Sequence, residues 1–228
     1  MKHTDPPTES FFEKKRQEMV RSQIQARGVK NPRVLKAMQT VPRHEFVPED
    51  MQEMSYMDRP LPIGHGQTIS QPYIVAYMTE LLRLGGGEKV LEVGTGLGYQ
   101  TAILATIARE VYTVEYVAEL AETARRLFQR LGYDNIHTRT GDGSQGWEEN
   151  APYEGILVTA SGPKVPDSLK QQLKTGGHLV MPVGKFRFGQ QIVRVTRGGG
   201  GTYHQENFLD VAFVPLLGQF GWEQSDAG

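Results

Sequence analysis

The chain has 228 residues, of which 38% are hydrophobic and 22% charged, and its formal net charge is -1 at pH 7. This length suits one domain with a substantial core, and the composition is typical of a globular protein. The small net charge gives no broad field that would attract nucleic acid or an anionic membrane. The absence of cysteine excludes disulfides, thiolate nucleophiles and cysteine-based metal sites. A local basic run, Lys14-Lys15-Arg16, is interpreted as the solvated face of a helix.

No targeting or membrane-spanning segment is expected. The first residues lack an apolar signal region, and no run approaches the roughly 18 apolar residues of a membrane span. The six histidines are scattered, and none shows a metal-ligand spacing such as His-x-x-x-His. We therefore expect a cytoplasmic protein without a metal ion.

The N-terminal third of the chain predicts three helices separated by irregular segments. Apolar residues near helical spacing predict a helix over residues 9–27, and Gly28 is placed to end it. Asn31-Pro32 combines a capping residue with a proline suited to the first turn, so a second helix is expected there. Proline and glycine make residues 56–71 too irregular for a regular element, and Pro72 opens a further helix.

Beyond Gly85-Gly86-Gly87 the apolar runs alternate between strand and helix patterns. The expected strands are 89–93, 111–115, 136–139, 155–159, 178–183, 191–196 and 203–214. The expected helices between them are 99–108, 117–131 and 166–172. This alternation favours an α/β fold in which a mostly parallel central sheet carries helices on both faces, with antiparallel C-terminal strands.

The most informative segment runs from Val90 to Gln100, where a buried strand leads through a glycine-rich turn into a helix. Glycine in such a turn lets a nucleoside-bearing cofactor approach the backbone, because no Cβ blocks it. The spacing does not fit the dinucleotide pattern Gly-x-Gly-x-x-Gly, and no Gly-Lys-Ser/Thr of a phosphate loop follows. The remaining pattern, Glu-x-Gly-x-Gly-x-Gly from Glu92 to Gly98, is that of Rossmann-like S-adenosylmethionine-dependent methyltransferases.

Polar residues at three further strand ends fall where ligands bind in open α/β sheets. Glu115 ends the second core strand, where a carboxylate can accept hydrogen bonds from both ribose hydroxyls. Asp142 follows the third strand and could meet the adenine amino group, and Thr159 follows the fourth and faces the methyl-transfer region. Each alone could be ordinary packing or a solvated acid, but their joint occurrence in this order favours a cofactor site.

Residues 61–72, Leu-Pro-Ile-Gly-His-Gly-Gln-Thr-Ile-Ser-Gln-Pro, resemble the signature that precedes the glycine turn in protein-L-isoaspartate O-methyltransferases. The resemblance covers nearly the whole chain apart from the two tails, and Thr68 to Pro72 is the part that discriminates within methyltransferases. It continues through residues 77–82, 94–102, 141–143, 173–177, 180–184 and 213–216. One departure follows the fourth core strand, where Gly162 replaces a proline usual in the family and is expected to loosen the loop.

The resemblance implies methyl transfer from S-adenosyl-L-methionine to the free α-carboxylate of L-isoaspartyl residues in damaged proteins and peptides. The resulting ester leads through a succinimide to normal aspartate. The acceptor is already ionised at neutral pH, so the reaction needs orientation and exclusion of water rather than a general base. Ser70 is the candidate catalytic residue that holds the acceptor, beside a helix start that favours an anion. The residues alone favour a helix cap for Ser70, the resemblance favours the acceptor role, and the two are compatible.

The strand-end pattern and the resemblance together give the expected site. The expected cofactor-binding residues are Gln67, Thr68, Glu92, Gly94, Thr95, Gly96, Gly98, Tyr99, Gln100, Glu115, Tyr116, Asp142, Gly143 and Thr159. The expected substrate-binding residues are Ile69, Ser70, Gln71, Val214 and Pro215.

No internal repeat or long linker divides the chain. We expect residues 1–8 to form a disordered tail and residues 9–224 to form a single methyltransferase domain that acts as a monomer. Residues 9–87 are expected to supply an N-terminal helical and substrate-loop region, residues 88–184 the cofactor-binding core, and residues 185–224 the C-terminal strands.

Three alternatives remain at this point. A methyltransferase for small molecules or RNA would keep the glycine turn and Glu115, but it has no reason for the sequence of residues 68–72. RNA would also favour an excess of positive charge or exposed stacking aromatics. A non-catalytic module that only binds the cofactor is disfavoured by the intact glycines and Ser70, and a nicotinamide oxidoreductase by the glycine spacing.

Overall fold

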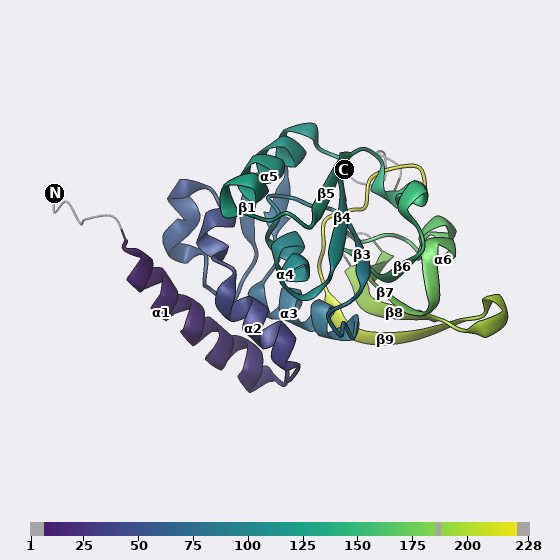
Figure 1. Cartoon of the computed structure of the whole chain (residues 1–228), viewed down its shortest axis with the longest axis horizontal. Helices are drawn as coiled ribbons and strands as arrows, with labels where there is room; N and C mark the ends of the chain where they lie inside the picture. The colour runs from purple at the N-terminus through teal and green to yellow at the C-terminus, as the bar shows by residue number, and fades with distance from the viewer. Residues whose placement is uncertain (1–6, 186–187, 223–228) are drawn as a thin grey trace.

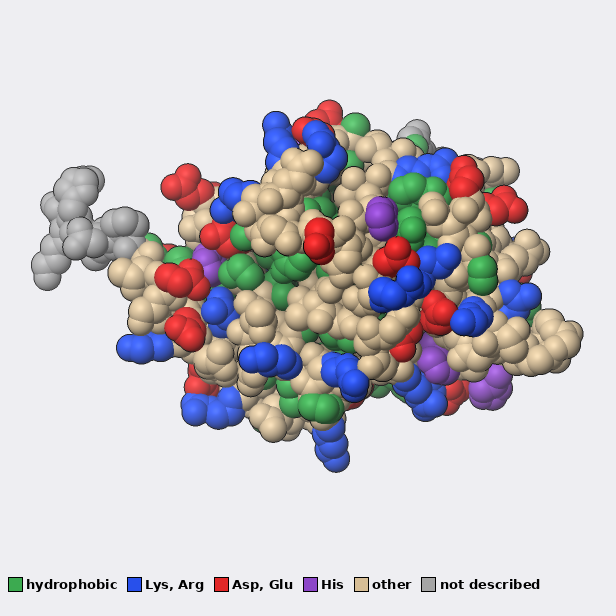
Figure 2. Space-filling model, viewed as in Figure 1, with side chains coloured by type: hydrophobic (Ala, Val, Ile, Leu, Met, Phe, Trp, Pro, Cys, Tyr) green, Lys and Arg blue, Asp and Glu red, His purple; other side chains and the backbone are tan. Residues whose placement is uncertain are grey.

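The computed structural model describes residues 7–185 and 188–222 of the chain (Figure 1). Residues 1–6 of the predicted N-terminal tail, and the C-terminal residues 223–228, lie outside the described residues. No helix in the described part of the chain combines the length and the apolar character that a membrane crossing needs. On the face seen in Figure 2, basic and acidic side chains are interspersed, as the balanced charge of the sequence implies.

The N-terminal helix follows the predicted range but changes its winding. α1 (Glu9–Met19) begins at Thr8, whose side-chain oxygen accepts a backbone N–H of the first turn. The helical path continues as a π-helical turn over Val20–Ile24 and a 3-10 turn over Gln25–Arg27. Gly28 then ends it with φ 99°, so the helix predicted over residues 9–27 is confirmed.

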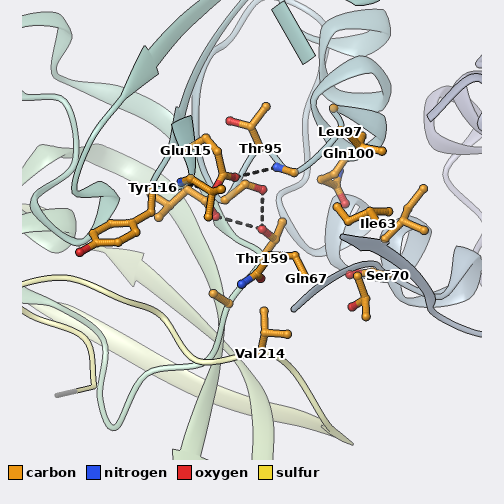
Figure 3. Close-up of a pocket in the computed structure, with 18 of the residues that line it drawn as sticks. Ile63, Gln67, Ser70, Thr95, Leu97, Gln100, Glu115, Tyr116, Thr159 and Val214 are labelled. Carbon is orange, nitrogen blue, oxygen red and sulfur yellow. Dashed lines mark hydrogen bonds between the residues drawn. The ribbon is translucent and has the colours of Figure 1, made fainter. Parts of the chain in front are cut away.

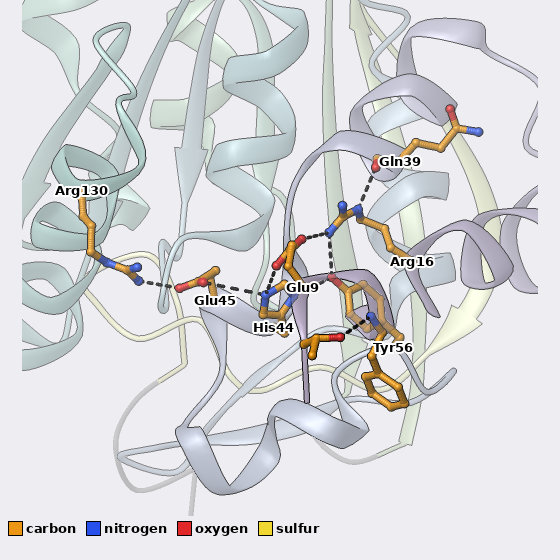
Figure 4. A network of polar contacts seen from close by, with 9 residues as sticks. Glu9, Arg16, Gln39, His44, Glu45, Tyr56 and Arg130 are labelled. Atoms are coloured by element: carbon orange, nitrogen blue, oxygen red, sulfur yellow. Dashed lines mark hydrogen bonds and ion pairs between the residues drawn. The ribbon is translucent and has the colours of Figure 1, made fainter. Parts of the chain in front are cut away.

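Arg16 departs from the prediction that Lys14-Lys15-Arg16 forms a solvated face. Both lysines are exposed, but Arg16 is only 7% exposed. Its guanidinium donates to the Gln39 carbonyl at 2.8 Å and to the Tyr56 hydroxyl at 3.2 Å (Figure 4). Arg16 lies one helical turn after the buried Phe12, so it shares the packed side of α1 rather than the solvated one.

The next two helices begin at the predicted prolines. α2 (Pro32–Thr40) is capped by Asn31, whose side-chain oxygen accepts two backbone N–H groups at 2.9 and 3.4 Å. α3 (Pro72–Leu81) has Gln71 as its N-cap, and no side chain there makes a capping hydrogen bond. The proline at the first helical position costs nothing because its missing N–H would have had no partner in the helix.

The segment predicted to be irregular contains a small antiparallel hairpin. β1 (Leu61–Gly64) pairs with β2 (Gln67–Ile69), so the prediction for this segment is wrong. The turn between the two strands is His65-Gly66, with φ values of 53° and 70°, and Gly64 before it has φ 90°. The glycines that suggested an irregular segment therefore shape a hairpin instead. Alternation within β1 buries Leu61 and Ile63 against the core.

The central sheet has the predicted mixed architecture. Its strand order is β5-β4-β3-β6-β7-β8-β9; the pairs from β5 to β7 are parallel, and the last two pairs are antiparallel. The strands are β3 (Lys89–Val93), β4 (Glu110–Glu115), β5 (Ile136–Thr140), β6 (Tyr153–Val158), β7 (Leu173–Lys185), β8 (Phe188–Arg197) and β9 (Tyr203–Val211). The helices between them are α4 (Tyr99–Ile107), α5 (Ala118–Leu131) and α6 (Asp167–Gln172).

The strands bury both faces, which gives two cores. Val90, Val111 and Leu157 belong to the larger core, which takes in the apolar sides of α1 to α5. Their neighbours Leu91 and Ile156 point the opposite way, into a smaller core that includes residues of α6. Alternation of side chains along each strand therefore accounts for the helices on both faces, as predicted.

The strand order reverses between β3 and β6. From β3 the chain passes to β4 and β5 on one side, and β6 then returns to the other side of β3. In open α/β sheets this reversal leaves a crevice at the carboxyl ends of the strands, where ligands bind. The glycine turn after β3 and Thr159 after β6 both lie there.

Candidate active site

A cavity with about 860 Å³ of empty space opens at this reversal point. Three parts of the chain that are distant in sequence line it: the β1–β2 hairpin, the ends of the core strands, and the segment after β9 (Figure 3). The predicted residues among its lining are Gln67, Thr68, Ile69, Ser70, Gly94, Thr95, Gly96, Gly98, Tyr99, Gln100, Glu115, Tyr116, Gly143, Thr159, Val214 and Pro215. The structure thus brings most of the predicted site into one cavity.

The glycine turn packs closely against neighbouring side chains. A Cβ at Gly94 would overlap the hydroxyl oxygen of Thr159, which donates to the Gly94 carbonyl at 2.6 Å. A Cβ at Gly98, where φ is 98°, would overlap the ring of Phe128 in α5. Packing alone therefore requires these two glycines, and the same turn leaves its backbone open towards the cavity.

Glu115 ties the glycine turn to the end of β4. One carboxylate oxygen accepts from the Gly96 N–H at 2.7 Å, and the other accepts from the Val117 N–H at 2.9 Å (Figure 3). A carboxylate has about four lone-pair directions, so each oxygen can accept one further hydrogen bond. Glu115 is 6% exposed and lines the cavity, so this remaining capacity is available at the cavity surface.

Glu92 lies behind the turn and does not line the cavity. Its side chain is fully buried; one oxygen accepts from the hydroxyls of Thr101 and Thr113, and the other has no partner among the described residues. Burial raises the pKa of Glu92 to about 8, although the two hydroxyls oppose this rise, so the group is protonated at neutral pH. Because Thr113 also contacts the Thr95 hydroxyl at 2.6 Å, Glu92 reaches the cavity only through these threonines, and its role towards the cofactor stays a prediction.

Asp142 also lies outside the cavity lining, whereas Gly143 lines it. The Asp142 carboxylate accepts from the Ser144 N–H at 2.9 Å and from the Gln219 N–H at 2.8 Å. Burial alone would raise the pKa of Asp142, but hydrogen bonds from Gln219, Ser144 and Gln145 outweigh it and lower that pKa. Asp142 thus joins the loop after β5 to the C-terminal segment, and its predicted contact with the adenine stays a prediction.

Ser70 lies at the opposite side of the cavity from Tyr116 (Figure 3). Its hydroxyl makes no hydrogen bond with the described residues, and the N-cap of α3 is Gln71, so Ser70 does not cap that helix. Its carbonyl accepts from the Arg43 guanidinium at 2.8 Å. Gln71 lies outside the cavity lining, and its side chain donates to the Asp58 carbonyl at 3.1 Å.

A further wall of the cavity comes from the segment after β9. Ser161, three residues beyond the end of β6, donates its N–H to the Val214 carbonyl and accepts from the Leu216 N–H, both at 2.8 Å. These bonds explain why β9 ends at Val211 rather than at residue 214 as predicted: the backbone groups of this segment pair with the loop after β6 instead of with β8. Val214 and Pro215 therefore face the cavity.

Comparisons with known proteins give a consistent answer. The family model for protein-L-isoaspartate(D-aspartate) O-methyltransferase matches residues 14–221. A protein-L-isoaspartate O-methyltransferase of Picosynechococcus is 55% identical over 217 residues, covering 93% of this chain and 96% of its own; another from Rhodopseudomonas palustris is 54% identical, covering 92% and 86%. The chain belongs to this family.

Solved structures of the family share the fold. One protein-L-isoaspartate O-methyltransferase superposes with a TM-score of 0.80 at 30% identity, covering 90% of this chain and 67% of its own. A Plasmodium falciparum protein assigned to the same family, solved in complex with S-adenosyl-L-homocysteine, gives a TM-score of 0.76 at 25% identity, covering 89% and 98%. Rossmann-like methyltransferase architecture and dependence on S-adenosyl-L-methionine follow from this membership.

The one predicted departure from the family pattern, Gly162, is held by two backbone hydrogen bonds. The Gly162 N–H donates to the Pro182 carbonyl at 3.2 Å, and its carbonyl accepts from the Gly184 N–H at 3.1 Å. A Cβ there would lie 2.7 Å from the Met181 side chain. A larger residue at this position of the methyltransferase would therefore require the end of the Met181 side chain to shift.

Several cavity residues were not identified from the sequence, and all of them are apolar. They are Phe46, Ile63, Val75, Val93, Leu97, Val114, Val117, Ala160, Leu216 and Leu217. Their side chains look like ordinary core residues in a single sequence, so only their neighbourhood to the motifs, as for Leu97 inside the glycine turn, could have indicated them.

Proposed function

We propose that this methyltransferase transfers a methyl group from S-adenosyl-L-methionine to the free α-carboxylate of L-isoaspartyl residues in damaged proteins and peptides. The ester then closes to a succinimide, which hydrolyses in part to normal aspartate. The observation that carries the proposal is that Ser70 and the glycine turn, the two motifs of the family, line one cavity. A donor and an acceptor bound at these two motifs can therefore meet.

The cavity fits the methyl donor. The turn carries no Cβ on Gly94, Gly96 or Gly98, and Glu115 keeps free lone pairs for the two ribose hydroxyls. Apolar residues such as Ile63 and Leu97 exclude water from the rest of the lining. When bound, S-adenosyl-L-methionine supplies an electrophilic methyl group on a positively charged sulfur.

The acceptor side needs no proton transfer. Among the described residues that line the cavity there is no histidine, lysine or arginine, and Glu115 is assigned to the ribose in this proposal. A carboxylate with an ordinary pKa near 3 to 4 is already ionised at neutral pH. The Ser70 hydroxyl, with no partner of its own, would donate to one acceptor oxygen and leave the other free to attack. Ile69 and Val214, from the two walls, would hold the peptide on either side.

The decisive experiment uses labelled S-adenosyl-L-methionine and two peptides that differ only in an isoaspartyl or a normal aspartyl residue. We expect base-labile label on the isoaspartyl peptide alone, because a methyl ester hydrolyses readily in base. Equal labelling of both peptides, or of neither, would reject the proposed substrate.

The finer predictions belong to the same proposal. The protein is expected to act as a monomer in the cytoplasm and to need neither nucleic acid nor a membrane. Residues 9–224 are expected to fold as a single domain. Size-exclusion chromatography with light scattering tests whether the protein is a monomer, and the unfolding experiment described in the Discussion tests whether it is a single domain.

A further inference from the structure

Arg43 is a fully buried arginine next to the cavity. It begins a short 3-10 turn, Arg43–Phe46, and is 0% exposed. Its Nε donates to the Ser55 carbonyl at 2.6 Å, and its Nη2 donates to the Ser70 carbonyl at 2.8 Å. Nη1 is buried with no hydrogen-bond partner among the described residues.

Among the described residues no carboxylate lies within ion-pair distance of Arg43, and the Asp58 carboxylate acts on its charge only from farther away. A buried cation normally requires a close partner of opposite charge. Burial lowers the pKa of Arg43 to about 10, although Tyr99, Tyr56 and Asp58 oppose this, so the guanidinium is still protonated at neutral pH. Arg16, the other arginine packed in this region, does have an acidic partner: Glu9 at 3.7 Å (Figure 4).

Two contacts of Arg43 lie in the proposed site. Ser70 provides both the carbonyl that Arg43 holds and the hydroxyl proposed to hold the acceptor. The guanidinium also lies over the ring of Tyr99, 4.8 Å from its centroid, and Tyr99 is the first residue of the helix that follows the glycine turn. Arg43 therefore connects the acceptor loop to the donor turn from behind the cavity wall.

We infer that Arg43 is a positioning residue, which fixes the Ser70 backbone against the donor turn and whose unpaired positive charge favours an anionic acceptor. This role rests on the proposed function, since it assumes that the acceptor binds at Ser70. A charge-assisted hydrogen bond to a carbonyl is stronger and better oriented than a neutral one, so it suits a loop that must not move. The carboxylate of the substrate would then supply the close negative charge that the folded chain does not.

The test compares R43M, R43K and the control R16M. Methionine is long and apolar and removes the charge, whereas lysine keeps the charge but cannot reach both the Ser55 and the Ser70 carbonyl. For R43M we expect the KM of an isoaspartyl peptide to rise roughly 10- to 100-fold, as for the loss of hydrogen bonds to a charged group. The Kd of S-adenosyl-L-homocysteine, measured by calorimetry, should change less than about threefold, because a methionine can still pack against the Tyr99 ring and Arg43 makes no contact with Glu115.

The ratio of two peptide affinities tests the charge of Arg43 separately from its support of the Ser70 backbone. With S-adenosyl-L-homocysteine bound, no reaction occurs, so calorimetry can compare the isoaspartyl peptide with its α-carboxamide analogue. We expect R43M to reduce the preference for the carboxylate by roughly tenfold or more, and R43K and R16M to keep it. R43K should still show a kcat several-fold below that of the wild type, because the Ser70 carbonyl loses part of its support.

The outcomes are distinguishable. A folded R43M with wild-type KM and wild-type preference, or an R16M that loses the preference equally, would overturn the role of Arg43. If R43M does not fold, R43K decides: a wild-type kcat or a lost preference would overturn it. A wild-type enzyme that methylates no isoaspartyl peptide would instead reject the proposed function itself.

Discussion

Ser70 is a residue whose proposed role in activity can be tested without changing the stability of the fold. Its hydroxyl has no partner in the described chain, so S70A removes no internal contact and should leave the thermal midpoint unchanged. Loss of a hydrogen bond to a charged acceptor costs about 1.5–3 kcal/mol, so kcat/KM for the isoaspartyl peptide should fall roughly 10- to 100-fold. Steady-state kinetics and calorimetry with S-adenosyl-L-homocysteine check this, since cofactor binding should be unaffected. An S70A enzyme with wild-type kcat/KM would leave Ser70 without the proposed role.

The raised pKa of Glu92 predicts an unusual dependence of stability on pH. Its pKa in the folded chain is about 8, above the ordinary value of 4.5, because burial disfavours the charged form. Between these two pH values Glu92 is protonated more in the folded state than in the unfolded state. The contribution of Glu92 to the free energy of unfolding is therefore complete below pH 4.5 and declines above it. It is lost as the pH rises through 8, at up to about 1.4 kcal/mol per pH unit.

The variant E92Q should remove this pH dependence, because glutamine is a near-isosteric neutral replacement for the protonated acid. We expect the free energy of unfolding, measured in urea from pH 5 to pH 9, to fall more steeply for the wild type than for E92Q. The comparison subtracts other titrating groups such as His44, whose pKa burial lowers and whose contribution is lost in the opposite direction. Parallel curves for the two proteins would show that Glu92 is ionised in the native state.

At the scale of elements, the acceptor wall after β9 depends on one buried side chain of β8. Gln190 is 2% exposed; its carbonyl oxygen accepts from the Phe213 N–H at 2.6 Å, and its amide donates to the Phe213 carbonyl at 3.2 Å. The side chain thus replaces a neighbouring strand for this residue. Val214, next in the chain, is thereby fixed against the cavity.

Q190L should therefore move the wall as well as destabilise the fold. Leaving buried backbone groups without partners costs about 1–3 kcal/mol, and the peptide KM should rise several-fold while cofactor affinity stays nearly constant. Q172L is a matched control, because Gln172 makes the same pair of bonds to the Trp147 N–H and the Gln145 carbonyl, away from the acceptor wall. Urea unfolding and kinetics on both variants check the prediction. Equal rises in peptide KM would show that general destabilisation, not the wall, is responsible.

Local patterns in the sequence predicted the elements whose signals are local. The capping residue Asn31, the proline of α3 and the alternation around β3 and β6 depend on neighbours in the chain, and those elements are where they were expected. The β1–β2 hairpin was missed because its strands have only four and three residues, too few for alternation to show. The end of β9 was misjudged because it depends on Ser161 and Gln190, which are remote in sequence.

The site shows the same division. The polar and glycine positions of the cavity were predicted because motif spacing and strand ends identify them. Burial of a charged group was not predicted, although the helical spacing of Arg16 from Phe12 and the place of Glu92 in a buried strand are local signs of it. Nothing local indicates that Arg43 is enclosed. The surroundings of these charged groups come from segments far apart in the chain, which only the folded structure brings together.

At the scale of the whole molecule, one ligand should stabilise the entire fold. The cavity is lined by the hairpin, the core turns and the C-terminal segment, so a bound ligand connects all three. S-adenosyl-L-homocysteine at 100 times its Kd would add about 2.7 kcal/mol to the free energy of unfolding, which for a chain of this length corresponds to roughly 5–10 °C. Differential scanning fluorimetry should show this shift for the wild type and a much smaller one for E115A. A thermal shift in E115A as large as that of the wild type would show that Glu115 does not bind the ribose.

Two tryptophans offer a test of whether residues 9–224 unfold as one unit. Trp147 packs edge-on against Tyr112 of the core sheet, whereas Trp222 is in the C-terminal segment and donates to the Ser161 carbonyl at 2.9 Å. In W222F the fluorescence reports on the core, and in W147F it reports on the C-terminal segment. A single cooperative domain requires that, in each variant, the urea midpoint from fluorescence coincide with that from far-ultraviolet circular dichroism. S-adenosyl-L-homocysteine should shift both probes together. If Trp222 fluorescence changed at lower urea than the dichroism of the same variant, the C-terminal segment would be an independently unfolding part, and the acceptor wall would open before the cofactor site is lost.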